Sequence, residues 1–203
     1  MSKILEPDWT QERPESTGAA IEKLWGHLRI SCVPEGELSA GRLLEALRRT
    51  HVNGGAEFRT FRLEGDPAFD WFMSRNRWEE IDFPKRLLQS SVVTAALPEV
   101  CDSPVDDPFG FEWGSAFTFA GELAQTLAQG GAYVKHAGGP GEAWEIADEF
   151  RTRTFGDRFE EVLILKSWRP WSAWFCDVAW DSTWLILDKR FVEVSVLAVT
   201  DTD

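Results

Sequence analysis

The sequence predicts an α+β fold in which helices pack on one face of a mixed or antiparallel sheet. Amphipathic helical patterns dominate the first half of the chain, strand patterns dominate its end, and the two do not alternate regularly. A chain of 203 residues can form one sizeable core but is short for two. We therefore expect residues 1–203 to form a single domain.

The first 63 residues predict two helices and two strands, of which the first is a short strand over 30–33. Residues 1–15 include two prolines and are expected to form an irregular lead-in. Apolar residues then recur at helical spacing over 16–28 and again over 39–52, where Asn53-Gly54-Gly55 ends the pattern. Alternation over 57–63 favours an exposed or edge strand.

The middle of the chain has no clean periodicity. Residues 92–94 are rich in β-branched side chains, and residues 98–114 are dense in Pro, Gly and Asp. We interpret 98–114 as a long structured loop. A connection of that length is often functional when it is ordered, and a tolerated surface insertion is the alternative.

The last third predicts two more helices and a β-meander. Helical patterns end at Gly130-Gly131 and at Gly156. The continuous apolar run 162–165 is typical of a central strand buried on both faces. Alternation over 174–181 predicts a strand with one wetter face, and 183–187 with 191–199 predicts a hairpin.

The acidic charge is concentrated in the second half. The formal net charge is −13, with 16 acidic and 13 basic residues in 1–100 against 18 and 8 in 101–203. Such a surface repels a phosphate backbone, which argues against nucleic acid as a partner. It would attract a basic protein, although acidity is also an ordinary solubility device.

Hydropathy and cysteine content indicate a cytoplasmic protein. No apolar run is long enough to span a bilayer, and the polar N-terminus has no secretory signal core. We therefore expect no membrane association. The three cysteines are too few and too scattered for a disulfide framework, which favours a reducing compartment.

The motifs of common enzymes are missing. The three histidines are far apart, no Cys-x-x-Cys occurs, and no Gly-x-Ser-x-Gly elbow is present. The turn Gly138–Gly141 lacks the Lys-Ser/Thr ending of nucleotide-binding loops. We expect no catalytic residues, metal or cofactor, although a reactive cysteine is left open.

Tryptophan is the other conspicuous feature, since seven of 11 lie at or after Trp113. Exposed tryptophans beside acidic residues suit a basic protein partner, because Trp is a common interface anchor. A core role for some of them, or a carbohydrate or small-ligand cleft that stacks on the same rings, is the alternative. The candidate partner-binding residues are Trp168, Trp171 and Trp184 as anchors, with Asp177, Asp181 and Asp188 as the charge complement.

Segments of the C-terminal half carry a resemblance. They are Gly130–Tyr133, Phe155–Phe159, Trp171–Phe175, Asp181–Trp184 and Thr200–Asp203. In these segments, and in size and acidity, the chain resembles small uncharacterised bacterial proteins and the immunity proteins of bacterial polymorphic toxin systems. The resemblance implies a cytosolic α+β domain without catalytic residues that blocks a toxin by occupying its surface.

The leading hypothesis is a non-catalytic acidic protein-binding module, immunity-like or antitoxin-like, that blocks a basic protein partner, for which a toxin is the candidate. The alternative is a small enzyme or ligand-binding domain with a cleft between the 98–114 loop and the C-terminal sheet. A pocket with convergent polar groups would favour this alternative, and an open acidic patch would favour protein binding. A homo-oligomer that buries its tryptophans is a third possibility.

Overall fold

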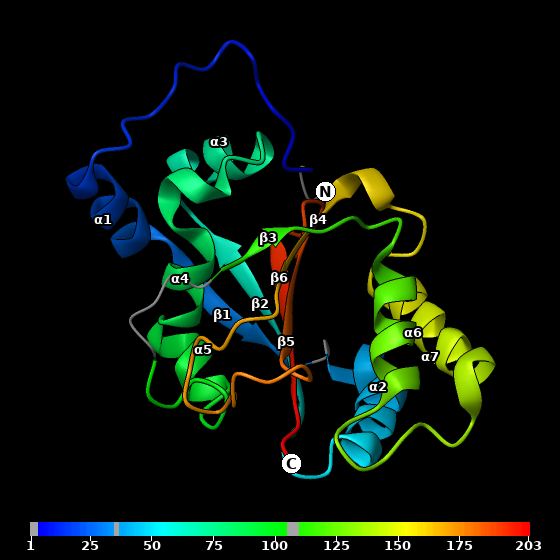
Figure 1. Cartoon of the computed structure of the whole chain (residues 1–203). Coiled ribbons are helices and arrows are strands. Elements are labelled where there is room, and N and C mark those ends of the chain that lie inside the picture. Colours follow the sequence, from blue (N-terminus) through cyan, green and yellow to red (C-terminus); the bar gives the residue numbers. More distant parts are fainter. Residues whose placement is uncertain (1–3, 35–36, 105–109) are drawn as a thin grey trace.

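The computed structural model describes residues 4–34, 37–104 and 110–203, which fold around one six-stranded sheet (Figure 1). Within these ranges, no helix combines the length and the hydropathy needed to cross a bilayer. The helices and strands, in chain order, are α1 (Gly18–His27), β1 (Arg29–Val33), α2 (Glu37–Thr50), β2 (Gly55–Glu64), α3 (Pro67–Ser74), η2 (Trp78–Ile81), α4 (Phe83–Leu88), α5 (Ser91–Ala96), β3 (Glu112–Trp113), α6 (Phe119–Gln129), α7 (Gly139–Thr154), η3 (Phe159–Glu161), β4 (Val162–Ser167), β5 (Ser182–Asp188) and β6 (Glu193–Thr200).

All strand pairs are antiparallel, in the order β1-β2-β6-β5-β4-β3. The α+β class and the predicted C-terminal meander are therefore confirmed, since β4, β5 and β6 are consecutive neighbours. The pairing of β6 with β2 joins the end of the chain to its first half. This long-range pair brings the loops after α2 and after β6 to the same edge of the fold.

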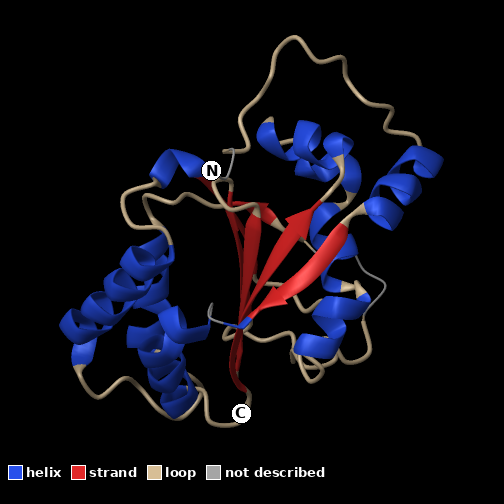
Figure 2. Cartoon of the chain, turned by 180° about the vertical axis from the view of Figure 1, so that it is seen from behind, coloured by secondary structure: helices blue, strands red, loops and turns tan. Residues whose placement is uncertain are grey.

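Helices cover both faces of the sheet, and not one face as the sequence prediction had it (Figures 1 and 2). One core contains side chains of α1, α3, α4 and α5 with Leu163 and Leu165 of β4. The other contains side chains of α2, α6 and α7 with Ile164 of β4 and Trp184 of β5. Because successive strand residues point to opposite faces, apolar residues at consecutive positions need cover on both sides.

Two segments differ from the local sequence pattern. Residues 174–181 form turns and not a strand: Asp177 has a left-handed φ of 57°, and the Asp181 carboxylate accepts a hydrogen bond from Val178 N at 3.1 Å. Residues 92–94 lie in α5, where Ser90 caps the helix by accepting from Val93 N. In both places side-chain capping of backbone groups overrides the strand pattern.

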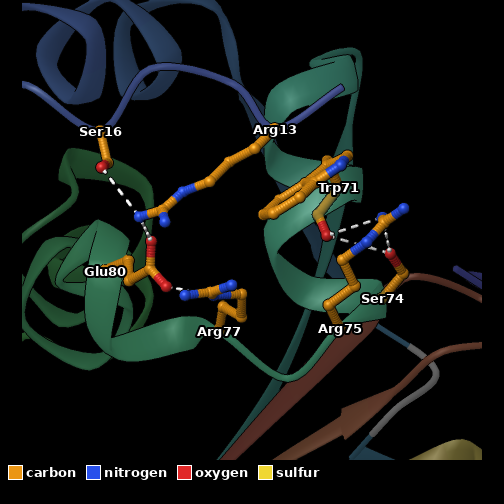
Figure 3. A network of polar contacts seen from close by, with 7 residues as sticks. All are labelled: Arg13, Ser16, Trp71, Ser74, Arg75, Arg77 and Glu80. Atoms are coloured by element: carbon orange, nitrogen blue, oxygen red, sulfur yellow. Dashed lines mark hydrogen bonds and ion pairs between the residues drawn. The ribbon is translucent and has the colours of Figure 1, made fainter. Parts of the chain in front are cut away.

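The lead-in has no helix or strand over 4–15, as expected, yet it is fastened to the fold. Leu5 is buried, and its N–H donates to Lys189 O at 2.8 Å. Figure 3 shows a second attachment, where Arg13 donates to Glu80 at 2.6 Å. Beside it, the Arg75 guanidinium lies 4.4 Å from the centroid of the Trp71 ring.

The 98–114 loop is a structured segment where it is described, and its residues 105–109 lie outside the described ranges. Its end forms β3, which pairs with β4 at the sheet edge. Its beginning packs on the segment that follows β4: Ser172 Oγ donates to Val100 O, and Ala173 N donates to Asp102 O. These direct contacts join the two segments between which the sequence placed a cleft.

Candidate ligand-binding site

Two of the three predicted tryptophan anchors are core residues. Trp171 is 1% exposed, and its indole N–H donates to Thr183 Oγ1 at 2.9 Å. Trp184 is 0% exposed and belongs to the core on the α2, α6 and α7 side. Burial therefore excludes both rings from a surface contact, which corrects the prediction. Of the three predicted anchors, only Trp168 is exposed enough, at 45%, to contact another molecule.

The three predicted acidic residues do not form an exposed ridge. Asp181 is buried and accepts from Thr200 Oγ1 at 2.5 Å, and Asp188 is buried in an ion pair with Arg158. Asp177 alone is exposed. Buried carboxylates need partners, and both of these residues use backbone or side-chain donors of the fold itself. The charge complement assigned to Asp181 and Asp188 is therefore wrong.

Trp168 lines a cavity of about 310 Å³ that we call the α6 pocket. Its ring packs edge-on against Trp184, with 5.5 Å between the ring centroids. The pocket lies on the sheet face covered by α2, α6 and α7, the group of helices on one side in Figure 2. Its walls come from the residue after α2, from one face of α6, from β4 and the residue after it, from the loop before β5, and from β5. The side chains concerned are His51, Glu122, Gln125, Thr126, Gln129, Lys166, Trp168, Trp180 and Ser182.

His51 lines this pocket and has a ring nitrogen without a partner among the described residues. The residue is 1% exposed, and its Nδ1 lies 3.1 Å from Leu47 O and 2.9 Å from Thr50 Oγ1. A carbonyl oxygen only accepts, so we assign the proton to Nδ1 and a lone pair to Nε2. Among the described residues Nε2 has no hydrogen-bond partner. Burial lowers the pKa of His51, which keeps the ring neutral at pH 7.

Glu122 and Ser182 add two further unsatisfied atoms. Glu122 Oε1 accepts from Thr118 Oγ1 at 2.9 Å and lies 3.5 Å from Lys166 Nζ. In the described part of the chain, Glu122 Oε2 and Ser182 Oγ are both buried and lack a hydrogen-bond partner. Six such atoms occur across the described ranges, and three of the residues that carry them line this one cavity. Buried polar atoms are normally paired, so this concentration makes the α6 pocket the strongest candidate site.

The polar wall contributed by α6 has a sequence pattern that was not among the predicted binding residues. Glu122, Gln125, Thr126 and Gln129 follow i, i+3, i+4, i+7 spacing, which places them on one helix face. The helix was predicted from the apolar residues on its opposite face, and the polar face was not considered as a binding surface. A continuous stripe of amide, hydroxyl and carboxylate groups is a feature that sequence inspection can find.

Asp201 positions the two loops beside the pocket. Its carboxylate is 0% exposed and accepts from Asn53 N at 2.8 Å and from Ala132 N at 2.7 Å. Asn53 follows α2 and His51, and Ala132 follows α6. A Cβ on Gly131 would lie 2.0 Å from Asp201 Oδ2 and 2.5 Å from Thr50 O. A glycine at this position is therefore required for the carboxylate to reach both loops.

A second surface carries an exposed aromatic side chain beside acidic residues. Phe117 is 74% exposed and stacks on Phe159, with 4.8 Å between centroids and 7° between ring planes. Both rings line a cavity of about 510 Å³, and the exposed residues Glu6, Asp157 and Glu160 line it as well. We call this surface the Phe117 face. It combines the two features that the sequence had assigned to the C-terminal sheet.

The remaining reactive groups are isolated. In the described ranges, no group of three or more His, Cys, Asp or Glu side chains is arranged to hold a metal ion. Cys32 and Cys176 are exposed thiols, whereas burial raises the pKa of Cys101 to about 11. Comparison of the chain with family models, with curated proteins and with solved structures gave no match.

Proposed function

We propose that this protein binds a small polar molecule in the α6 pocket. One observation carries the proposal: His51, Glu122 and Ser182, which come from three different parts of the chain, line one cavity, and each has a buried side-chain atom without a hydrogen-bond partner among the described residues. A buried polar atom without a partner costs about 1–3 kcal/mol. A ligand that hydrogen-bonds to all three recovers this cost on binding, which accounts for their arrangement.

The arrangement favours binding over nucleophilic catalysis. A serine nucleophile needs a base within hydrogen-bond reach of its hydroxyl. Neither Ser182 Oγ nor His51 Nε2 has any hydrogen-bond partner in the described part of the structure, so the two atoms are not bonded to each other. The site therefore offers groups that can bind a ligand but no activated nucleophile. Of the two alternatives, a ligand-binding domain is better supported than a small enzyme.

An NMR screen of small polar compounds tests this proposal. We expect hits to shift the indole N–H resonances of Trp168 and Trp180, which both line the pocket. Trp168→Ala removes an exposed side chain of the pocket wall and should raise the dissociation constant of a hit about tenfold, because stacking area is lost. Trp144→Ala, at a 53% exposed tryptophan on α7, is the matched control. A screen whose hits all leave the pocket resonances unmoved would contradict the proposal.

The protein-binding hypothesis is the second candidate, and the Phe117 face favours it. An exposed aromatic anchor with carboxylates around it suits a basic protein, as the resemblance to immunity proteins implies. We propose that an immunity-like or antitoxin-like inhibitory contact uses Phe117 and the neighbouring acids Asp157 and Glu160 in place of the buried residues of the C-terminal sheet.

This second candidate is tested with a defined partner. If the gene beside this one encodes a toxin-like protein, its purified product is the first probe, measured at low and high salt. We expect its affinity to fall with salt and to fall about tenfold or more in Phe117→Ala. Tyr133→Ala is the control, since Tyr133 is also exposed, at 67%. A partner that binds wild type and Phe117→Ala equally would place the interface elsewhere.

A further inference from the structure

Building on the proposed function, we propose that the ligand of the α6 pocket is an uncharged, polyhydroxylated molecule, namely a mono- or disaccharide. The chemistry of the walls carries this inference in three respects, which are charge, hydrogen bonding and ring stacking. The cavity volume of about 310 Å³ lies at the small end of ligand sites and suits one or two sugar rings.

The charges of the lining side chains cancel. Glu122 contributes a carboxylate and Lys166 an ammonium group, with 3.5 Å between Oε1 and Nζ. Lys166 Nζ also lies 3.9 Å from Glu112 Oε1 at the sheet edge. An anionic ligand would meet the Glu122 carboxylate, and a cationic ligand would meet the Lys166 ammonium. A neutral ligand avoids both repulsions.

The unsatisfied atoms call for a ligand with several donors that can also accept. Glu122 Oε2 and, in the assigned tautomer, His51 Nε2 are acceptors, so each needs a donor from the ligand. Ser182 Oγ can donate or accept, and so can the amide groups of Gln125 and Gln129 at the exposed rim. Hydroxyl groups, which donate and accept at the same atom, match this mixed set.

Two indole rings complete the match. Trp168 is half-exposed, Trp180 is half-buried, and both line the pocket beside the polar wall of α6. Indole rings offer large rigid apolar faces with one polar edge. A sugar ring has the same division, because its C–H groups form apolar faces and its hydroxyls project from the rim. Lys166 Nζ lies 5.7 Å from the Trp168 ring centroid, which holds a donor beside that ring.

The experiment titrates the whole chain with D-glucose, D-galactose, N-acetyl-D-glucosamine and maltose. Glucosamine, glucose 6-phosphate and adenosine serve as cationic, anionic and planar comparators. We expect at least one neutral sugar to shift the Trp168 and Trp180 indole resonances, and to bind more tightly than its charged relatives. Glu122→Gln should weaken that sugar about 10- to 100-fold, because a charge-assisted hydrogen bond is lost. Glu145→Gln, on the exposed side of α7, is the matched control.

The possible outcomes separate this inference from the proposed function. Adenosine or a charged sugar that shifts the pocket resonances, with no neutral sugar doing so, would overturn the carbohydrate inference and leave the proposed site intact. If no polar compound in the screen or in this titration shifts them, both are overturned. Should Glu122→Gln fail to fold, Gln125→Ala at the exposed rim replaces it, with a loss of about threefold or more expected.

Discussion

Removal of the Asp201 carboxylate should destabilise the protein more than any other single change at a charged residue near the α6 pocket. Asp201 is 0% exposed and accepts one hydrogen bond from Asn53 N at 2.8 Å and one from Ala132 N at 2.7 Å. These two amides belong to the loops after α2 and after α6. In Asp201→Ala both amides lose their acceptor, and the two loops lose their common attachment.

The magnitude follows from the two contacts. A hydrogen bond to a charged group contributes about 1.5–3 kcal/mol, so two such bonds set an upper range of about 3–6 kcal/mol. Both contacts are only partly buried, so water can reach the freed amides and recover part of the loss. We therefore expect Asp201→Ala to lower the free energy of unfolding by about 2–4 kcal/mol. Asp201→Asn keeps one acceptor oxygen and should lose about half as much.

Urea unfolding followed by tryptophan fluorescence measures these differences. Asp203→Ala is the control, since Asp203 is an exposed carboxylate two residues away, and it should stay within about 0.5 kcal/mol of wild type. The reasoning is refuted if Asp201→Ala also stays within about 0.5 kcal/mol. It is refuted as well if Asp201→Asn is as unstable as Asp201→Ala, because the loss would then not follow the number of acceptors.

Three further predictions concern neighbouring features. Burial lowers the pKa of His51 below its ordinary value of about 6.5, so the unfolded chain takes up the proton first and stability is lost as the pH falls below about 6.5. His51→Gln should flatten the pH dependence of the free energy of unfolding between pH 7 and 5, and urea titrations that give parallel curves would contradict this. Iodoacetamide should modify Cys32 and Cys176 in the native protein but spare Cys101, whose thiol pKa is raised to about 11, and mass spectrometry of the labelled chain decides the point. Gly131→Ala should lower the melting temperature by several degrees, because its Cβ would lie 2.0 Å from a buried carboxylate oxygen; an unchanged melting temperature would show that the loop yields freely.

The sequence by itself determined most of the regular elements. The helical patterns predicted α1, α2, α6 and α7, and the strand patterns predicted β1, β2, β4, β5 and β6. The expected edge position of β2 was wrong, since β2 lies between β1 and β6. These elements could be predicted because helical and strand periodicities are local properties of the chain. The apolar run of β4 also implied cover on both faces of the sheet. The prediction that helices pack on one face only did not take this into account.

Local pattern was misleading where side chains act on the backbone nearby. Residues 174–181 alternate like a strand, yet the Asp181 carboxylate accepts from Val178 N and Asp177 adopts a left-handed φ. The segment is therefore a series of turns. Asp181 is also not part of the predicted binding surface, because its buried carboxylate already accepts hydrogen bonds from Thr200 and Val178 and is not available to a partner.

Only the tertiary structure decided which side chains meet. His51, Glu122, Lys166 and Ser182 are distant in sequence and come from the end of α2, α6, β4 and β5. Their convergence depends on the pairing of β2 with β6, which joins the two halves of the chain. Hydrophobic periodicity states that a residue faces a core or solvent, but it does not state which distant residue lies opposite. That choice follows from strand order and loop closure, which depend on the whole chain.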